Sequence, residues 1–377
     1  MAAYITQIKL PVRYQFGRQT PILTERNIAE AIIIAEPTPL YDFHLENART
    51  RDYLYANKTL RYPYYQTMAH QPMHINDWLE ISSQYEHNLQ LKKAVIAEHV
   101  KGAKVLDSLP ENDAACAELL EMAVDYLPKR YPTLFERLLH GEKDGIRNGV
   151  TGHVIEWPKA EVPVGIDALR HVSCLTECDF LMAREREDGH VHFTGGLVAL
   201  PGSYLLSEKI GQRMSEVHGP VPQFNDKLLL SVERTLKRMH PSAPFERSSW
   251  AIVDDKNLFW HNIASLPVGA EITRPPAELF LRIDRQTFRK LPRTKAIIFG
   301  VHPFLRPMSE PASLPLMPSL LLRVLTESNR AMLEYKSIAR FERALIPWLR
   351  QAEAEQVRKG LISGTEGVRD FRAYRAS

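Results

Sequence analysis

Between residues 61 and 150, apolar residues recur every three or four positions, which is the spacing of helices that bury one face. Two such runs are present, and Asn76 stands before the first as a candidate N-cap. The second begins near Pro110 and ends at Leu127-Pro128. The repeating positions are Trp78, Ile81, Tyr85 and Leu89 in the first run and Ala115, Leu119, Met122 and Tyr126 in the second. We therefore predict a helical segment over residues 61–150, with these aromatic side chains in the core.

Short β-rich runs replace the helical pattern between residues 151 and 310. They are 180–183, 190–193, 197–200, 250–253, 279–283 and 296–301. Turn signals separate the first three, namely Asp188-Gly189, Gly195-Gly196 and Pro201-Gly202. A helix from Asn225, with Leu228, Val232 and Leu236 on one side, is predicted to cover one face of the resulting sheet. Because helices do not alternate with strands, we predict an α+β fold around a central antiparallel sheet.

The two ends of the chain have weaker patterns. Residues 1–60 show no clean period and are predicted to form an N-terminal arm. A proline-rich link introduces a helical segment over residues 311–350, and residues 351–377 are predicted to be a charged tail.

Composition narrows the class of protein. The 377-residue chain is 44% hydrophobic and 25% charged, with a formal net charge of +3, which is ordinary for a globular protein. This mild excess of positive charge does not indicate a nucleic-acid binder, which usually has a concentrated basic patch. No apolar run reaches the ~20 residues of a membrane span, and the first residues lack a signal-peptide pattern. We expect a cytoplasmic protein with neither a nucleic acid nor a membrane as its partner.

Cysteine usage and missing motifs limit the redox chemistry open to this chain. Its three cysteines, Cys116, Cys174 and Cys178, argue against a disulfide framework. They are also too few for the thiolates of an iron–sulfur cluster. There is no Gly-x-Gly-x-x-Gly run for a nicotinamide or flavin. If the chain performs redox chemistry, its electrons must therefore come from another protein.

Residues 207–224 contain the sequence features that point most clearly to a functional site. Apolar residues spaced by four and three, Ile210, Met214 and Val217, predict one or two helical turns before His218. The Gly-Pro-Val-Pro run that follows is predicted to stop the helix and hold the chain extended. An imidazole aimed from so stiff a junction suits a ligand to a metal or haem iron. A histidine at a helix end can equally hydrogen-bond the last carbonyls of the helix, and the pattern alone leaves both roles open.

Several blocks of sequence resemble the haem-dependent oxidative N-demethylase family. They are Glu208-Lys209-Ile210-Gly211, Val217-His218-Gly219-Pro220-Val221-Pro222, Leu127-Pro128-Lys129-Arg130-Tyr131-Pro132, Arg247-Ser248-Ser249-Trp250, Leu281-Arg282-Ile283-Asp284-Arg285-Gln286-Thr287, Arg289-Lys290-Leu291-Pro292-Arg293-Thr294 and Tyr335-Lys336. The resemblance covers roughly residues 60–350. Several blocks in the right order are a far stronger signal than any one of them.

The resemblance implies a PAS-like haem-binding core over residues 151–310, with His218 as the axial ligand of haem b. A haem pocket also needs cations for the propionates, and the candidates are Lys209, Arg247, Arg282 and Arg285. For any single one of these the alternative is an ordinary ion pair. Glu208 and Asp284 are candidate carboxylates for a protonated amine substrate. The alternative for Glu208 is an acid that interacts with the N-terminus of a helix.

The same resemblance implies a reaction and a partner. The family removes an N-methyl group oxidatively, releasing an amine and formaldehyde, so the substrate is expected to be a small methylated amine. Its electrons are expected to come from NADPH through flavin and iron–sulfur centres on a separate reductase. A basic stripe on the helix from Asn225 (Lys227, Ser231, Arg234 and Arg238) is ordinarily a solvated face, but it could receive an acidic partner.

The sequence departs from the family pattern at three places. His302-Pro303-Phe304 replaces an arginine- and tyrosine-containing run, Met68-Ala69-His70 stands in place of Met-Gly-Leu, and Cys178 stands in place of an acid. These changes put substrate and activity in question. His302 could act as a second haem ligand, which would suit a non-catalytic haem or small-ligand sensor. A scaffold subunit without cofactor is the third interpretation.

Overall fold

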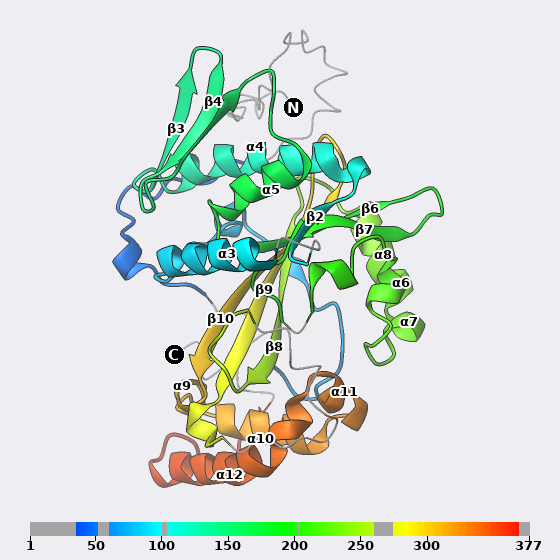
Figure 1. The fold of residues 1–377 in the computed structure, drawn as a ribbon. Coiled ribbons are helices and arrows are strands. Elements are labelled where there is room, and N and C mark those ends of the chain that lie inside the picture. Colours follow the sequence, from blue (N-terminus) through cyan, green and yellow to red (C-terminus); the bar gives the residue numbers. More distant parts are fainter. Residues whose placement is uncertain (1–34, 52–59, 100–103, 203, 260–273, 369–377) are drawn as a thin grey trace, which may run out of the picture.

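The structure of this protein is a computed structural model that describes residues 35–51, 60–99, 104–202, 204–259 and 274–368 (Figure 1). Most of the predicted N-terminal arm lies outside the described residues. The described part contains ten α-helices, which are α3 (Tyr85–His99), α4 (Asp113–Arg130), α5 (Gly165–Ser173), α6 (Met214–Val217), α7 (Phe224–Lys227), α8 (Leu229–Arg238), α9 (Ser309–Ala312), α10 (Met317–Glu327), α11 (Arg330–Tyr335) and α12 (Glu342–Arg358). The strands are β1 (Gln71–Pro72), β2 (Leu106–Ser108), β3 (Phe135–His140), β4 (Lys143–Asn148), β5 (Val154–Pro158), β6 (Asp179–Glu185), β7 (Val191–Leu197), β8 (Phe245–Val253), β9 (Phe280–Lys290) and β10 (Ile297–Pro307).

A seven-stranded sheet in the order β1-β8-β9-β10-β6-β7-β2 organises the molecule. Every pairing in it is antiparallel, and β3, β4 and β5 form a separate three-stranded sheet. The prediction of an α+β fold with a central antiparallel sheet is confirmed. The long strands β9 and β10 lie at its centre and pair over their whole length.

Side-chain alternation gives the large sheet two different faces. One face packs against α6–α8 through a cluster that includes Leu181, Phe193, Phe288 and Ile297. The other face is covered by two groups of helices (Figure 1). At one end α3–α5 pack on residues such as Phe180 and Ile298, and at the other end α10–α12 pack on residues such as Trp250 and Ile283. We call the first side the α8 side of the sheet and the second side the far side.

Several predicted boundaries shift. The first predicted helix begins at Tyr85 and not near Asn76, because the preceding residues form only a short 3-10 turn, η2 (Ile75–Asp77). Trp78 is buried but precedes the helix. Helix α4 continues through Pro128 to Arg130, and α12 runs to Arg358, beyond the predicted boundary at residue 350. Residues 61–150 also contain the β3–β4 hairpin, which was not part of the predicted helical segment.

The Gly195-Gly196 pair is not a turn, contrary to the prediction. Both residues lie inside β7, where the strand runs so close to its neighbours that side chains would not fit. A Cβ on Gly196 would meet the Phe180 carbonyl oxygen at 2.4 Å. The Asp188-Gly189 hairpin is confirmed, since β6 and β7 pair on either side of it and Gly189 has a φ of +74°. In this sheet glycine permits close strand contact at one site and a turn at the other.

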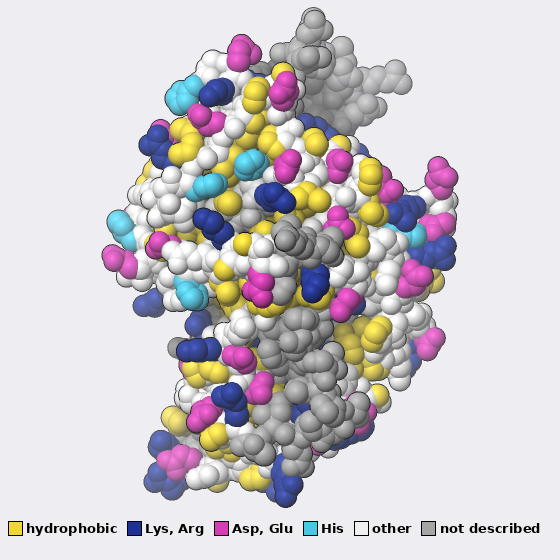
Figure 2. All heavy atoms as spheres, in the orientation of Figure 1, with side chains coloured by type: hydrophobic (Ala, Val, Ile, Leu, Met, Phe, Trp, Pro, Cys, Tyr) yellow, Lys and Arg dark blue, Asp and Glu magenta, His cyan; other side chains and the backbone are white. Residues whose placement is uncertain are grey.

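Charged side chains of both signs are interspersed over the face of the molecule seen in Figure 2. No helix among the described residues is long and apolar enough to cross a lipid bilayer.

Candidate functional site

A cavity of about 660 Å³ lies on the α8 side of the sheet. Its floor is formed by β6 to β10, its cover by α6, α7 and α8, and its rim by the segments around Tyr204 and Tyr335. Such a volume is typical of pockets that hold cofactors or drug-sized ligands. His218, Glu208, Lys209, Arg247 and Asp284, which the sequence nominated, all line this one cavity.

The floor of the cavity has an apolar end and a polar end. Phe288 lies between Phe245 and Phe299 in a row of stacked rings, with centroid distances of 4.8 and 4.7 Å. Farther along the strands, Arg247 pairs in register with Gln286, and Ser249 with Asp284. The helical cover adds mostly apolar side chains, which are Met214, Val217, Val221, Phe224, Leu228, Val232 and Leu236. The cavity is therefore an apolar slot with charged groups at one end.

His218 ends the single turn of α6 and takes the capping role that the sequence left open. Its Nδ1 lies 3.0 Å from the Met214 carbonyl oxygen. A carbonyl can only accept, so Nδ1 carries the proton and Nε2 has a lone pair. The ring stacks on Phe224 at a centroid distance of 4.3 Å. Burial lowers the pKa of His218 to about 4, despite the opposing hydrogen bond to Met214, so the imidazole is neutral at physiological pH.

The chain after His218 turns tightly and does not extend as predicted. The Val221 N–H donates to the His218 carbonyl at 2.9 Å, and α7 begins at Phe224. This turn brings the Phe224 ring back onto the imidazole. A neutral ring with one nitrogen hydrogen-bonded to the backbone is the usual state of a metal-ligating histidine.

Glu208 and Lys209 lie at the rim of the cavity. Glu208 closes the 3-10 turn η4 (Leu206–Glu208) by accepting the Leu205 N–H at 2.9 Å, so the helix-terminus role weighed in the sequence is present. Lys209 lies over the Tyr204 ring at 5.7 Å, and burial lowers the pKa of its ammonium.

Arg247 is a cation without a counter-ion. No ion pair or hydrogen bond joins its guanidinium to another residue in the described part of the chain, and its Nε is buried without a partner. Burial lowers the pKa of Arg247, and the nearby Tyr64 only partly offsets this. A partly buried guanidinium without an anion is costly unless a ligand supplies one.

Arg282 is fully engaged within the protein. Its Nε donates to Asp284 Oδ1 at 2.9 Å, and its two Nη groups donate to the carbonyls of Leu200, Pro201 and Leu258. It therefore holds Asp284 at the edge of the cavity, beside Gly202. A Cβ on Gly202 would lie 3.4 Å from Asp284 Oδ2.

Residues 69–346 match the family described as haem-dependent oxidative N-demethylase, alpha subunit-like. The match spans well over half of the chain and confirms the resemblance read from the sequence blocks. The chain belongs to this family. The family name also implies other subunits, since it designates an alpha subunit.

The fold does not bring every nominated residue to the cavity. Arg285 is fully buried on the far side of the sheet, where it pairs with Glu246 at 2.8 Å and donates to the backbone of Trp78. His302 faces the same way, 3.5 Å from Glu177. Burial alone would lower the pKa of His302, but the Glu177 carboxylate outweighs burial and raises it to about 10. Neither side chain reaches a group bound on the α8 side.

The residues of this family member fit a haem. The slot offers apolar walls, His218 presents a basic nitrogen, and the unpartnered Nε of Arg247 lies at the polar end, where a carboxylate would neutralise it. Apolar walls, a nitrogen that can bind iron and a cation for a propionate are features that haem sites use.

Sequence reasoning missed two groups at the site. One is Phe224, which fixes the plane of the His218 ring. The other is the rim formed by Glu334, Ser337 and Arg340. The Tyr335-Lys336 block pointed to this rim, and Lys336 anchors it by donating to the Trp250 carbonyl at 2.6 Å.

Proposed function

We propose that this chain is the haem-binding oxygenase component of an oxidative amine N-demethylase. The observation that carries the proposal is His218, a neutral imidazole held through Nδ1 by a backbone carbonyl at the wall of an apolar cavity. The same cavity contains Arg247, whose Nε has no partner in the described part of the chain. In this proposal His218 Nε2 is the axial ligand of haem b.

Arg247 and Lys209 are the proposed partners of the haem propionates. Both cations line the cavity, and burial lowers the pKa of each. Two carboxylates would offset that cost. Arg282 has the different role of holding Asp284, and Arg285 has no place in the site because it lies on the far side.

Bound haem b would supply the activation of O₂. The overall reaction is R₂NCH₃ + O₂ + 2e⁻ + 2H⁺ → R₂NH + HCHO + H₂O, in which the hydroxylated methyl group leaves as formaldehyde. Asp284 is the proposed partner of the ammonium group of a small methylated amine, because it lines the cavity and Arg282 holds it there through its Oδ1. Glu208 stands at the rim, where it can attract the cation on entry.

The electrons are proposed to come from NADPH through flavin and iron–sulfur centres on a separate reductase. The chain's three cysteines cannot hold a four-thiolate cluster. A redox partner also agrees with the alpha-subunit designation of the family. The proposal keeps the cytoplasmic location expected from the sequence, where NADPH is available.

The arrangement of the sheet supports a PAS-like core. If β6, β7, β8, β9 and β10 are numbered 1 to 5 in chain order, their spatial order is 2-1-5-4-3, with α6–α8 inserted between the second and third strands. We propose that this core is PAS-like and that the inserted helices cover its ligand.

The sensor alternative loses its main support. It depended on His302 as a second haem ligand, and His302 pairs with Glu177 on the far side of the sheet. No observation favours it over the oxygenase.

Formaldehyde release tests the proposal. Haem-reconstituted protein is mixed with mono-, di- or trimethylamine and hydrogen peroxide, which provides the oxygen atom and replaces both O₂ and the external electrons. The expected result is formaldehyde from at least one amine, and a rate lowered at least tenfold by Asp284→Asn. The oxygenase assignment would be contradicted if haem-loaded protein released no formaldehyde under either condition, that is, neither with peroxide nor with O₂ and a chemical reductant.

A further inference from the structure

Helix α8 separates the cavity from the solvent. Val232 and Leu236 line the cavity from its inner side, and Leu230, Arg234 and Arg238 are exposed on its outer side. A helix with its side chains is about 10–12 Å across. A protein seated on the outer side of α8 would therefore lie one helix diameter from whatever occupies the cavity.

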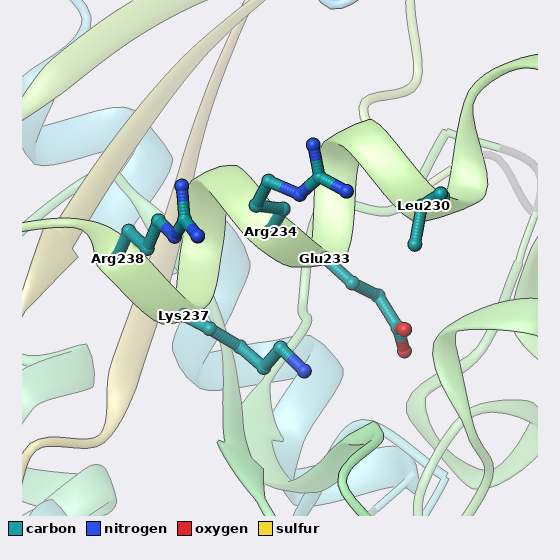
Figure 3. A pocket seen from close by; sticks show the side chains of 5 residues that line it. All are labelled: Leu230, Glu233, Arg234, Lys237 and Arg238. Atoms are coloured by element: carbon teal, nitrogen blue, oxygen red, sulfur yellow. The ribbon is translucent and has the colours of Figure 1, made fainter.

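The outer side of α8 is cationic because the single acid of the helix is engaged by protein groups and almost unexposed. Glu233 is buried and accepts the Val191 N–H at 3.1 Å. Lys237 is half-buried between Glu185, at 3.3 Å, and the Gly189 carbonyl. Arg234 and Arg238 extend into solvent, and no ion pair joins either of them to another described residue (Figure 3).

An apolar group and a shallow depression accompany these charges. Leu230 is 71% exposed, although it is a large hydrophobic residue. Together with Glu233, Arg234, Lys237 and Arg238 it lines a surface hollow of about 320 Å³ (Figure 3). An exposed leucine beside two arginines that form no ion pair with the described residues has the composition of a docking site, which combines apolar contact with charges for orientation.

We propose that this surface, the α8 face (Leu230, Arg234, Lys237 and Arg238), docks an acidic electron-transfer protein that carries an iron–sulfur cluster. The inference rests on the proposed function, because only a redox cofactor in the cavity would need such a donor. Each docking event would transfer one electron from the reduced cluster to a cofactor held in the cavity, so two events would supply one turnover. Charge complementarity selects the partner, and the single helix thickness makes this face a short route to the cavity.

Binding of a defined probe tests the α8 face. The probe is a purified acidic plant-type [2Fe–2S] ferredoxin, titrated against the protein at 20, 100 and 200 mM NaCl. Arg234→Glu/Arg238→Glu is expected to weaken binding at least tenfold at low salt and to flatten the salt dependence. Arg234→Gln/Arg238→Gln should give an intermediate loss, which keeps the test valid if the charge reversal disturbs folding.

The matched control is Lys93→Glu/Arg350→Glu, which makes the same change in net charge on exposed positions of α3 and α12. It should alter binding less than twofold. Equal losses in the two double variants, or no binding by the unaltered protein at 20 mM NaCl, would overturn the proposal.

A second readout separates this inference from the proposed function. In haem-loaded protein, the reduction rate is followed with reduced ferredoxin and, separately, with dithionite, which needs no docking site. The Arg234→Glu/Arg238→Glu variant should be slowed at least tenfold with ferredoxin and unchanged with dithionite. If ferredoxin reduced the variant and the unaltered protein at equal rates, the proposed docking on the α8 face would be overturned and the proposed function would stand. A chain that takes up no haem would instead refute the proposed function.

Discussion

The two nitrogens of the His218 ring have separate tasks. Nδ1 is committed to the Met214 carbonyl, which is the one hydrogen bond that the ring makes to the described residues. The ring can thus serve as a helix cap and as a ligand at once, and the backbone hydrogen bond selects the tautomer that ligation requires. The two roles that the sequence left open are compatible.

The depressed pKa of His218 predicts how haem binding depends on acidity. Its folded-state pKa of about 4 lies below the ordinary value of 6.5, so the imidazole stays neutral and able to bind iron well below pH 6.5. Haem affinity, measured by Soret titration, should remain within twofold between pH 7.5 and 5.5. A tenfold or greater fall across that interval would show that the ring titrates as an ordinary histidine.

Arg247 predicts opposite effects on stability and on haem affinity. Without the cofactor its partly buried guanidinium has no counter-ion among the described residues, so Arg247→Met should raise the free energy of unfolding of the haem-free protein by about 1 kcal/mol. Because a hydrogen bond to a charged group contributes about 1.5–3 kcal/mol, the same change should weaken haem binding roughly 10- to 100-fold. Arg350→Met, on an exposed position of α12, should change neither quantity. Urea unfolding and Soret titration measure the two effects, and equal haem affinities would exclude a propionate contact.

Residues were predicted correctly as cavity residues when they lay in blocks of sequence that resemble the family. The prediction failed for residues whose side-chain direction depends on which face of a strand they occupy. His218, Lys209, Arg247 and Asp284 were nominated from separate blocks and line one cavity. Arg285 was nominated with Asp284, although neighbouring residues of a strand point to opposite faces. The alternation of side chains along a strand shows that only one of Asp284 and Arg285 can face the cavity. Which of the two does so depends on the contacts of the sheet with α6–α8.

At the scale of elements, the sequence predicted the existence of most helices and strands better than their ends. Five of the six predicted strand runs correspond to parts of β6, β7, β8, β9 and β10, and the sixth begins as β7 ends. The strands proved longer because β9 and β10 continue through charged residues that pair inside the protein, such as Arg285 and His302. Hydropathy marks such residues as polar, so it ends the predicted strand too early.

Gly196 provides a test at this scale. Its missing side chain lets β7 approach β6, and a Cβ there would lie 2.4 Å from the Phe180 carbonyl oxygen. Gly196→Ala should therefore lower the free energy of unfolding by about 3 kcal/mol. Gly189→Ala is the control, because it occupies the hairpin with open space around it and costs only the left-handed backbone strain, about 1 kcal/mol. Equal losses in urea unfolding would mean that β7 relaxes around the added methyl group.

At the scale of the whole molecule, the sheet separates the side with the proposed haem cavity from a side with buried ion pairs. The far side holds buried charges that join distant segments. Glu177 accepts hydrogen bonds from the Ser82 N–H and hydroxyl and from the Asn88 side chain, and it faces His302 at 3.5 Å. Segments that precede and begin α3 are thereby fixed to β10 through one carboxylate.

The Glu177–His302 pair predicts how stability depends on pH. The folded-state pKa of His302, about 10, lies above its ordinary value of 6.5. Its stabilising contribution is therefore full below about pH 6.5 and is lost as the pH rises to about 10. His302→Gln should lower the free energy of unfolding by roughly 3 kcal/mol at pH 6, and the difference from the unaltered protein should shrink toward pH 10. A difference that is constant from pH 6 to 10 would show that His302 is neutral.

The proposed division of labour between the two sides rests on His218, and haem binding by matched variants tests it most directly. Haem b is titrated into the unaltered protein, His218→Ala and His302→Gln at pH 7, and the Soret spectrum is recorded. We predict a stoichiometric Soret band in the unaltered protein and in His302→Gln, and its loss or a large shift in His218→Ala. An unchanged spectrum in His218→Ala, or a loss only in His302→Gln, would contradict the assignment of the haem to the α8 side of the sheet.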